Sequence, residues 1–174
     1  MCGIVGYIGK HAAAPVILEG LSKLEYRGYD SAGMAVLDGE RIQIKKSAGR
    51  LKVLEELTHG GATMPGNIGI GHTRWATHGA PSDANSHPHY NAEETIAVVH
   101  NGIIENYLPL KEKMISKGYK FVSDTDTEVL AHLIDYYYKG NPLEAITKVM
   151  HRVQGSYALG ILFAEHPDQI FAVT

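Results

Sequence analysis

The 174-residue sequence has a single cysteine, Cys2, so the chain cannot form an internal disulfide. Its longest basic run is Lys45-Lys46, and the formal net charge is -3, from 16 lysine and arginine residues against 19 aspartate and glutamate residues. Nucleic acid and membranes are therefore not expected as partners. No apolar run approaches the ~18 residues of a membrane span. Together these absences predict a soluble protein of a reducing compartment, and we expect a cytoplasmic location.

The common signatures of metal and phosphate chemistry are also missing. Ten histidines are present, but there is no second cysteine and no His-Glu-x-x-His pattern. No Gly-x-x-x-x-Gly-Lys loop occurs that could cradle a phosphate. We therefore expect no metal and no cofactor, and we interpret the histidines as hydrogen-bonding groups of loops and of a cleft.

The length predicts one domain with a sizeable core. Strands that come in pairs, with helices inserted between them, favour an α+β layered domain over a doubly wound parallel sheet. The last strand stops at Thr174, so we expect the chain to end inside its fold. Apolar patterning predicts strands at residues 2–8, 32–37, 41–46, 67–74, 95–100, 119–122, 156–164 and 169–173. It predicts helices at residues 15–25, 51–57 and 108–117. Two further helices are predicted, one that starts at residues 125–128 and one that starts at Asn141-Pro142.

Three short patterns predict where elements begin or turn. Asp38-Gly39 is typical of a tight hairpin turn, and Thr125 with Glu128 matches the capping box at the start of a helix. Asn101-Gly102 allows two interpretations. Spacing alone favours a hairpin turn, whereas the side-chain NH₂ and the glycine amide could instead serve as neighbouring donors to an oxyanion.

Cys2 is the strongest candidate for a nucleophile. If Met1 is removed, the thiol and a free α-amine belong to the same residue. The two groups have similar pKa values in model peptides, so the amine can act as the general base, a role that histidine has in other enzymes. The alternative, which position alone favours, is that Cys2 is a small apolar residue at the start of a strand.

Arg74 and Asp126 are candidates for binding an amino acid, which has two charged ends. Arg74 offers a planar fork for a carboxylate, with Trp75 beside it as a flat apolar wall. Asp126 could bind an ammonium group, but an acidic residue in the first turn of a helix usually complements the helix dipole. Arg27 could form a structural ion pair with Asp30. Taken singly, each simple structural interpretation is favoured.

Six segments together carry a specific resemblance, in the same order and with compatible spacing over essentially the whole chain. The chain resembles the glutaminase domains of the glucosamine-6-phosphate synthase family, which are class II glutamine amidotransferases. The segments are Cys2-Gly-Ile-Val-Gly6, Leu24-Glu-Tyr-Arg-Gly-Tyr-Asp-Ser-Ala-Gly33, His72-Thr-Arg-Trp-Ala-Thr-His-Gly79, His87-Pro-His89, Val99-His-Asn-Gly-Ile-Ile-Glu-Asn106 and Ser123-Asp-Thr-Asp-Thr-Glu128.

The resemblance implies the four-layer αββα fold of N-terminal nucleophile hydrolases and a role for each matching residue. Cys2 would attack the side-chain amide of glutamine, and its α-amine would pass the thiol proton to the departing ammonia. Asn101 and Gly102 would hold the oxyanion. Arg74 would bind the α-carboxylate of glutamine and Asp126 its α-ammonium group. The remaining substrate-site residues would be Trp75, Thr77, His78, Arg27 and Gly28.

Longer members of this family also carry sugar-isomerase domains that bind fructose 6-phosphate, and they are expected to form homodimers. We expect residues 1–174 to be a C-terminally incomplete glutaminase domain that lacks those partner domains. It would supply the ammonia of hexosamine (amino sugar) biosynthesis and by itself would only hydrolyse glutamine. Two alternatives remain, an inert glutamine-binding or assembly module if Met1 is retained, and a related hydrolase that acts on another amide.

Overall fold

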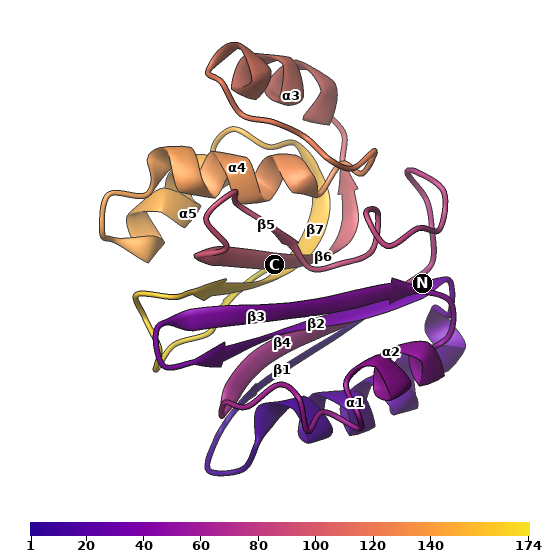
Figure 1. Cartoon of the computed structure of the whole chain (residues 1–174). Coiled ribbons are helices and arrows are strands. Elements are labelled where there is room, and N and C mark those ends of the chain that lie inside the picture. Colours follow the sequence, from indigo (N-terminus) through magenta and orange to yellow (C-terminus); the bar gives the residue numbers. More distant parts are fainter.

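The computed structural model describes all 174 residues and places two four-stranded sheets face to face (Figure 1). The first sheet has the order β1-β4-β2-β3 and the second the order β5-β6-β7-β8, and every neighbouring pair is antiparallel. The predicted α+β layering is therefore confirmed. The strands are β1 (Gly3–Ile8), β2 (Ser31–Asp38), β3 (Arg41–Ala48), β4 (Ile68–Arg74), β5 (His89–Tyr90), β6 (Ile96–Ile104), β7 (Gly155–Phe163) and β8 (Phe171–Val173).

Helices cover the two outer faces of the sheet pair. Figure 1 shows α1 and α2 along the first sheet and α4 and α5 along the second, while α3 lies apart at one end. No helix has both the length and the apolar character that crossing a bilayer requires. The helices are α1 (Ala13–Leu24), α2 (Leu51–Leu57), α3 (Tyr107–Ser116), α4 (Glu128–Tyr137) and α5 (Pro142–Met150), and a short 3-10 helix spans Glu25–Arg27.

Three apolar clusters fill the spaces between the four layers. Ile17 of α1 and Met34 of β2 belong to the first, whereas Ala35 of β2 packs with Val99 of β6 between the sheets. Leu130 of α4 belongs to the third cluster, on the outer face of the second sheet. Both faces of β2 are thus covered, which explains why this strand is a continuous apolar run rather than an alternating one.

The Asn101-Gly102 pair does not form a turn, contrary to the interpretation that spacing favoured. Both residues lie inside β6, where Asn101 pairs with Ala158 and Gly102 with Tyr157. Gly102 has φ +124°, and a Cβ there would lie 2.0 Å from the carbonyl oxygen of Ser156. The partner strand continues past the pair, so the chain stays extended, and only glycine fits the close approach of β7.

The β2–β3 turn and the start of α1 each lie one residue or more away from their predicted positions. The β2–β3 hairpin pairs Asp38 with Arg41, so the turn consists of Gly39 and Glu40, with φ +62° at the glycine. Helix α1 begins at Ala13 rather than residue 15, because proline is tolerated within the first turn of a helix. The two-residue strand β5 was not predicted at all.

The predictions of a capping box at Thr125 and Glu128 and of a strand at residues 119–122 are both wrong, and one set of contacts explains both. Helix α4 begins at Glu128, later than the capping box requires, and the Glu128 carboxylate reaches backwards instead. It accepts hydrogen bonds from the amides of Val122 (2.9 Å) and Ser123 (2.8 Å) and from the Ser123 hydroxyl (2.5 Å). Residues 119–122 therefore run along α4 without a strand partner, with Phe121 packed against His132.

Glu128→Gln is expected to lower the free energy of unfolding by about 2 to 3 kcal/mol at pH 7. Although burial alone would raise it, hydrogen bonds from His132, Ser123 and the Val122 amide lower the pKa of Glu128 from 4.5 to about 2. A lowered carboxyl pKa stabilises the fold above pH 4.5, and this contribution disappears as the pH falls towards 2. Urea unfolding of wild type and variant from pH 7 to pH 3 measures this contribution to the free energy of unfolding.

The control for this prediction is Glu144→Gln, which removes an exposed carboxylate paired with Lys148 on α5. We expect that change to alter the free energy of unfolding by less than about 0.5 kcal/mol. Equal pH slopes for wild type and Glu128→Gln would contradict the prediction.

Candidate active site

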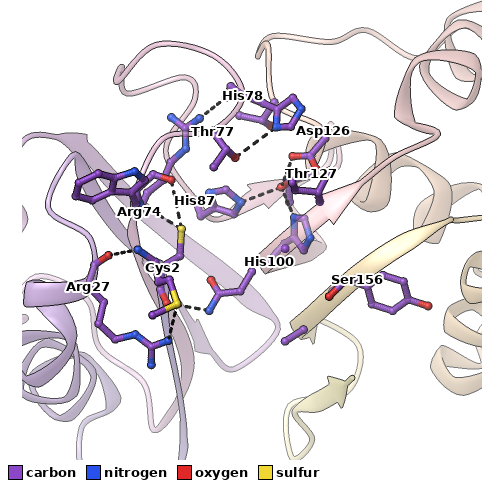
Figure 2. A pocket seen from close by; sticks show the side chains of 18 residues that line it. Cys2, Arg27, Arg74, Thr77, His78, His87, His100, Asp126, Thr127 and Ser156 are labelled. Carbon is purple, nitrogen blue, oxygen red and sulfur yellow. Dashed lines mark hydrogen bonds between the residues drawn. The ribbon is translucent and has the colours of Figure 1, made fainter.

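A cavity of about 570 Å³ opens where the ends of the two sheets meet (Figure 2). Its walls come from the two residues before β1, the end of the 3-10 helix, the end of β4 with the loop after it, β6, the turn before α4 and the start of β7. Gly28, predicted with the substrate site, lies outside the lining. The nine other predicted site residues all line the cavity: Cys2, Arg27, Arg74, Trp75, Thr77, His78, Asn101, Gly102 and Asp126.

The antiparallel pairing of β1 with β4 brings Cys2 to Trp75. Gly3 pairs with Thr73, so the same register places Cys2 opposite Arg74, the last residue of β4, and next to Trp75. The Cys2 sulfur accepts a hydrogen bond from the Trp75 amide at 3.2 Å and lies 3.5 Å from the Trp75 carbonyl oxygen. The thiol is partly exposed to the cavity. The backbone of Trp75 thus fixes the position of the sulfur beside the cavity.

The chain terminus lies in the cavity as well. The Met1 ammonium group donates to the carbonyl oxygen of Arg27 at 2.6 Å, and the Arg27 guanidinium contacts the Met1 thioether sulfur at 3.9 Å. Gly28 packs against the backbone of Arg74, where a Cβ would lie 2.8 Å from the carbonyl carbon. The absence of a side chain at Gly28 thus lets the Arg27 segment approach the end of β4 and hold the terminus.

Asn101, on the opposite sheet, contacts Cys2, the candidate nucleophile. Its side-chain nitrogen donates to the carbonyl oxygen of Cys2 at 3.2 Å. Cys2 precedes a strand of the first sheet, and Asn101 belongs to β6 of the second. The site is therefore assembled across the interface between the two sheets.

Two opposite charges line the same cavity. Arg74 is 3% exposed, and burial lowers the pKa of its guanidinium against the opposing effect of Cys2, Asp30 and Asp126. One Asp126 oxygen accepts from the Ile104 amide at 2.8 Å, which anchors the carboxylate on β6. A cation and an anion held in one cavity match the two charged ends of a free amino acid.

The loop that carries Thr77 and His78 is attached at both ends. Arg74 donates to the carbonyl oxygens of His78, Gly79 (3.1 Å) and Ala80 (3.5 Å). Further along, Lys46 donates to three carbonyl oxygens in the segment 84–88, at 2.9 to 3.2 Å. The guanidinium that faces the cavity thus also holds this loop.

Four buried histidines form a cluster at one wall of the cavity, which His87 and His100 line. They are His72, His87, His89 and His100, and the rings of His72 and His87 stack at 4.1 Å. Burial lowers the pKa of His72 to about 3 and that of His87 and His89 well below the usual range. Neutral rings are therefore expected at pH 7. No group of three or more His, Cys, Asp or Glu side chains has an arrangement that could hold a metal ion.

Several lining residues were not predicted from the sequence. Thr127 lies in a segment that the resemblance quoted, but its polar character was attributed to a helix start. Its hydroxyl lies 2.9 Å from His87 Nε2 and 2.8 Å from His100 Nδ1. Residues 156–158 also line the cavity, and only the pairing of β7 with β6 brings them there. No sequence pattern could have found them.

Comparison with known proteins decides the family. The profile of the glutamine amidotransferase domain matches residues 72–174, which is more than half of the chain. The chain belongs to the glutamine amidotransferase family. Its resemblance to the glutaminase domain of the glucosamine-6-phosphate synthases is confirmed as well, by curated relatives that match nearly the whole chain.

Two of these relatives are glutamine–fructose-6-phosphate aminotransferases (isomerizing). The protein of Clostridium tetani is 64% identical over 173 residues, and that of Caldanaerobacter subterraneus is 63% identical over 172. In both cases the match covers 99% of this chain but 28% of the relative. The chain thus spans less than a third of the length of these relatives.

Solved structures confirm the fold of this amidotransferase domain. The glutamine phosphoribosylpyrophosphate amidotransferase of B. subtilis, solved with ADP and GMP, superposes with a TM-score of 0.80 at 30% identity. The similarity covers 94% of this chain and 35% of that one. The predicted four-layer fold of the N-terminal nucleophile hydrolases is therefore confirmed.

Proposed function

We propose that this amidotransferase domain hydrolyses the side-chain amide of glutamine to glutamate and ammonia through a thioester on Cys2. The observation that carries the proposal is the meeting of Cys2, Asn101, Arg74 and Asp126 in one cavity, from four separate segments of the chain. A nucleophile, an oxyanion donor and a pair of opposite charges are the groups that this substrate needs.

The first half of the reaction forms the thioester. With Met1 removed, the Cys2 α-amine takes the thiol proton while the sulfur attacks the amide carbon. Asn101 and the Gly102 amide stabilise the resulting oxyanion. Collapse of this intermediate breaks the C–N bond, and the protonated amine returns its proton to the departing ammonia. A water molecule then attacks the thioester, which releases glutamate and the free thiol.

The substrate is held by groups around the nucleophile. Arg74 binds the α-carboxylate, in exchange for its present bonds to the loop carbonyls, and Asp126 binds the α-ammonium group. The Ile104 amide bonds one Asp126 oxygen, and the other accepts a longer bond from the Thr127 hydroxyl (3.4 Å) and can still accept from the ammonium group. Thr77 and His78 line the pocket, Trp75 and Arg27 line it beside Cys2, and Gly28 lets the Arg27 segment approach.

In a longer protein the ammonia would be consumed rather than released. The relatives are named for transfer of nitrogen from glutamine to fructose 6-phosphate. We propose that this chain performs the ammonia-producing half of that reaction, with sugar-isomerase domains as its partners in a homodimeric protein. Alone, it acts only as a glutaminase.

The test of the proposal is release of ammonia and glutamate in equal amounts from glutamine, measured on chain whose N-terminus has been sequenced. Asparagine, whose side chain is one methylene shorter, serves as the control substrate and is expected to give no release. Release from asparagine but not glutamine would make the domain a related hydrolase of another amide, and absence of release from both would overturn the proposal.

Asp126→Asn is expected to raise the KM for glutamine by about 10- to 100-fold with a smaller effect on kcat, because an ionic bond to the ammonium group is lost. The asparagine side chain at position 126 can still accept the hydrogen bond from the Ile104 amide, so the local fold is kept. Asp124→Asn is the matched control, since Asp124 lies two residues away and outside the cavity. Steady-state kinetics measures both, and an unchanged KM in Asp126→Asn would refute this role.

A further inference from the structure

His72 connects the two sheets beneath the cavity. It lies in β4 of the first sheet and is fully buried. Its Nε2 atom lies 2.9 Å from the carbonyl oxygen of His100 and 2.9 Å from Oδ1 of Asn101, both on β6 of the second sheet. Of the four clustered histidines, His72 is the one whose side chain contacts the side chain of Asn101.

The position of the proton on His72 follows from its neighbours. Both partners of Nε2 are oxygens that only accept, so Nε2 carries the hydrogen. Burial lowers the pKa of His72 to about 3, so the ring is neutral at pH 7 and Nδ1 has no proton. Nδ1 is buried without a hydrogen-bond partner, which is tolerable for a bare acceptor and costly for a donor.

This proton determines which way the Asn101 carboxamide faces. Rotating the amide by half a turn would place its NH₂ group against the Nε2–H of His72, and two donors would then meet. In the observed orientation Oδ1 faces His72, and the NH₂ group faces the cavity and donates to the Cys2 carbonyl oxygen at 3.2 Å. That bond uses one of the two N–H groups, and the second remains for a ligand.

We infer that His72 is a positioning residue for amide hydrolysis, which holds the Asn101 carboxamide so that its free N–H points at the oxyanion. The inference rests on the function proposed above. Cys2 is carried by the first sheet and Asn101 by the second, so the distance between nucleophile and donor depends on a contact between sheets. The bond from His72 is such a contact, and donors held in advance are the ones that stabilise a transition state most.

The other buried histidines have different partners. His87 and His100 both bond the hydroxyl of Thr127, and His89 lies 3.0 Å from the hydroxyl of Thr125. His89 does not line the cavity. It therefore provides a matched control, since it has similar burial and one side-chain hydrogen bond but no contact with Asn101.

The first experiment compares His72→Met, His72→Gln and His89→Met in the glutaminase assay. His72→Met is expected to lower kcat by about 10- to 100-fold, part of the ~10²- to 10³-fold effect of losing an oxyanion donor, with KM changed less than about threefold. His72→Gln keeps an N–H near the Nε2 position and is expected to recover most of kcat. His89→Met is expected to keep wild-type kcat, and equal losses in His72→Met and His89→Met would overturn the inference.

A double-mutant cycle separates positioning from general stability. Asn101→Ala removes the donor, so His72→Met in that background is expected to cost less than about threefold in kcat. The same loss in both backgrounds would mean that His72 does not act through Asn101.

The proton itself can be observed without any activity, which keeps the inference testable if His72→Met does not fold. Nitrogen-15 NMR of the wild-type imidazoles, assigned by the missing signal in His72→Gln, is expected to report a neutral His72 with the proton on Nε2. A proton on Nδ1 would overturn the inference. A chain without glutaminase activity would overturn the proposed function instead, and the NMR result would still stand on its own.

Discussion

Cys2→Ala is expected to lower glutamine hydrolysis by at least about 10⁴-fold, because the group that forms the covalent intermediate is gone. The sulfur bonds only the backbone of Trp75 and is partly exposed, so the free energy of unfolding is expected to change by less than about 1 kcal/mol. Ammonia release measures the first effect and urea unfolding the second.

Glutamine binding by the Cys2→Ala variant distinguishes loss of the nucleophile from loss of the substrate site. Calorimetric titration of Cys2→Ala with glutamine is expected to report binding, since Arg74 and Asp126 are untouched. Cys2→Ser is the closer control, because it replaces the thiol by a hydroxyl, which is similar in size but a poorer nucleophile. A Cys2→Ala chain with more than about 1% of wild-type turnover would show that the thioester route is wrong.

Retention of Met1 is expected to lower turnover by about 10²- to 10⁴-fold, which is the usual contribution of a general base. With Met1 present, the Cys2 nitrogen is part of a peptide bond and cannot take a proton. Met1 itself also lines the cavity, and its ammonium group is held by the carbonyl oxygen of Arg27. The same chain would then bind glutamine and hydrolyse it only slowly, which approaches the inert alternative.

A single preparation tests this dependence. Chain translated without methionine aminopeptidase is divided, and one half is treated with the enzyme before both are assayed for ammonia release. Intact-mass spectrometry confirms which half has lost Met1. Equal turnover in the two halves would contradict the proposed role of the α-amine.

The sequence predicted most elements of the fold because their signals are local. The apolar spacing of residues 51–57 predicts α2 with its observed bounds, and Asn141 caps α5 by accepting from the Glu144 amide at 3.2 Å. One error occurred where a distant segment replaces the local signal. Asn101-Gly102 favours a turn in isolation, but pairing with β7 keeps it extended.

The candidate site was predicted through the order of its motifs rather than through any one of them. Cys2, Arg74, Asn101 and Asp126 each have a simpler structural interpretation alone, and the resemblance assigned them to one site. It did not identify Thr127, residues 156–158 or the contact between His72 and Asn101. These depend on the register of strands far apart in the chain, which local patterning does not encode.

The sequence by itself determined the layered α+β class, the candidate nucleophile and the chemical types of the groups around it, because composition, periodicity and motif order are properties of the chain. Only the tertiary structure decided that Asn101-Gly102 lies in a strand and faces Cys2 across two sheets. It also decided that the Asn101 amide lies between a buried histidine and the Cys2 carbonyl oxygen. Those features arise from packing one sheet on another, and the hydrogen bonds between the sheets exist only once both have formed.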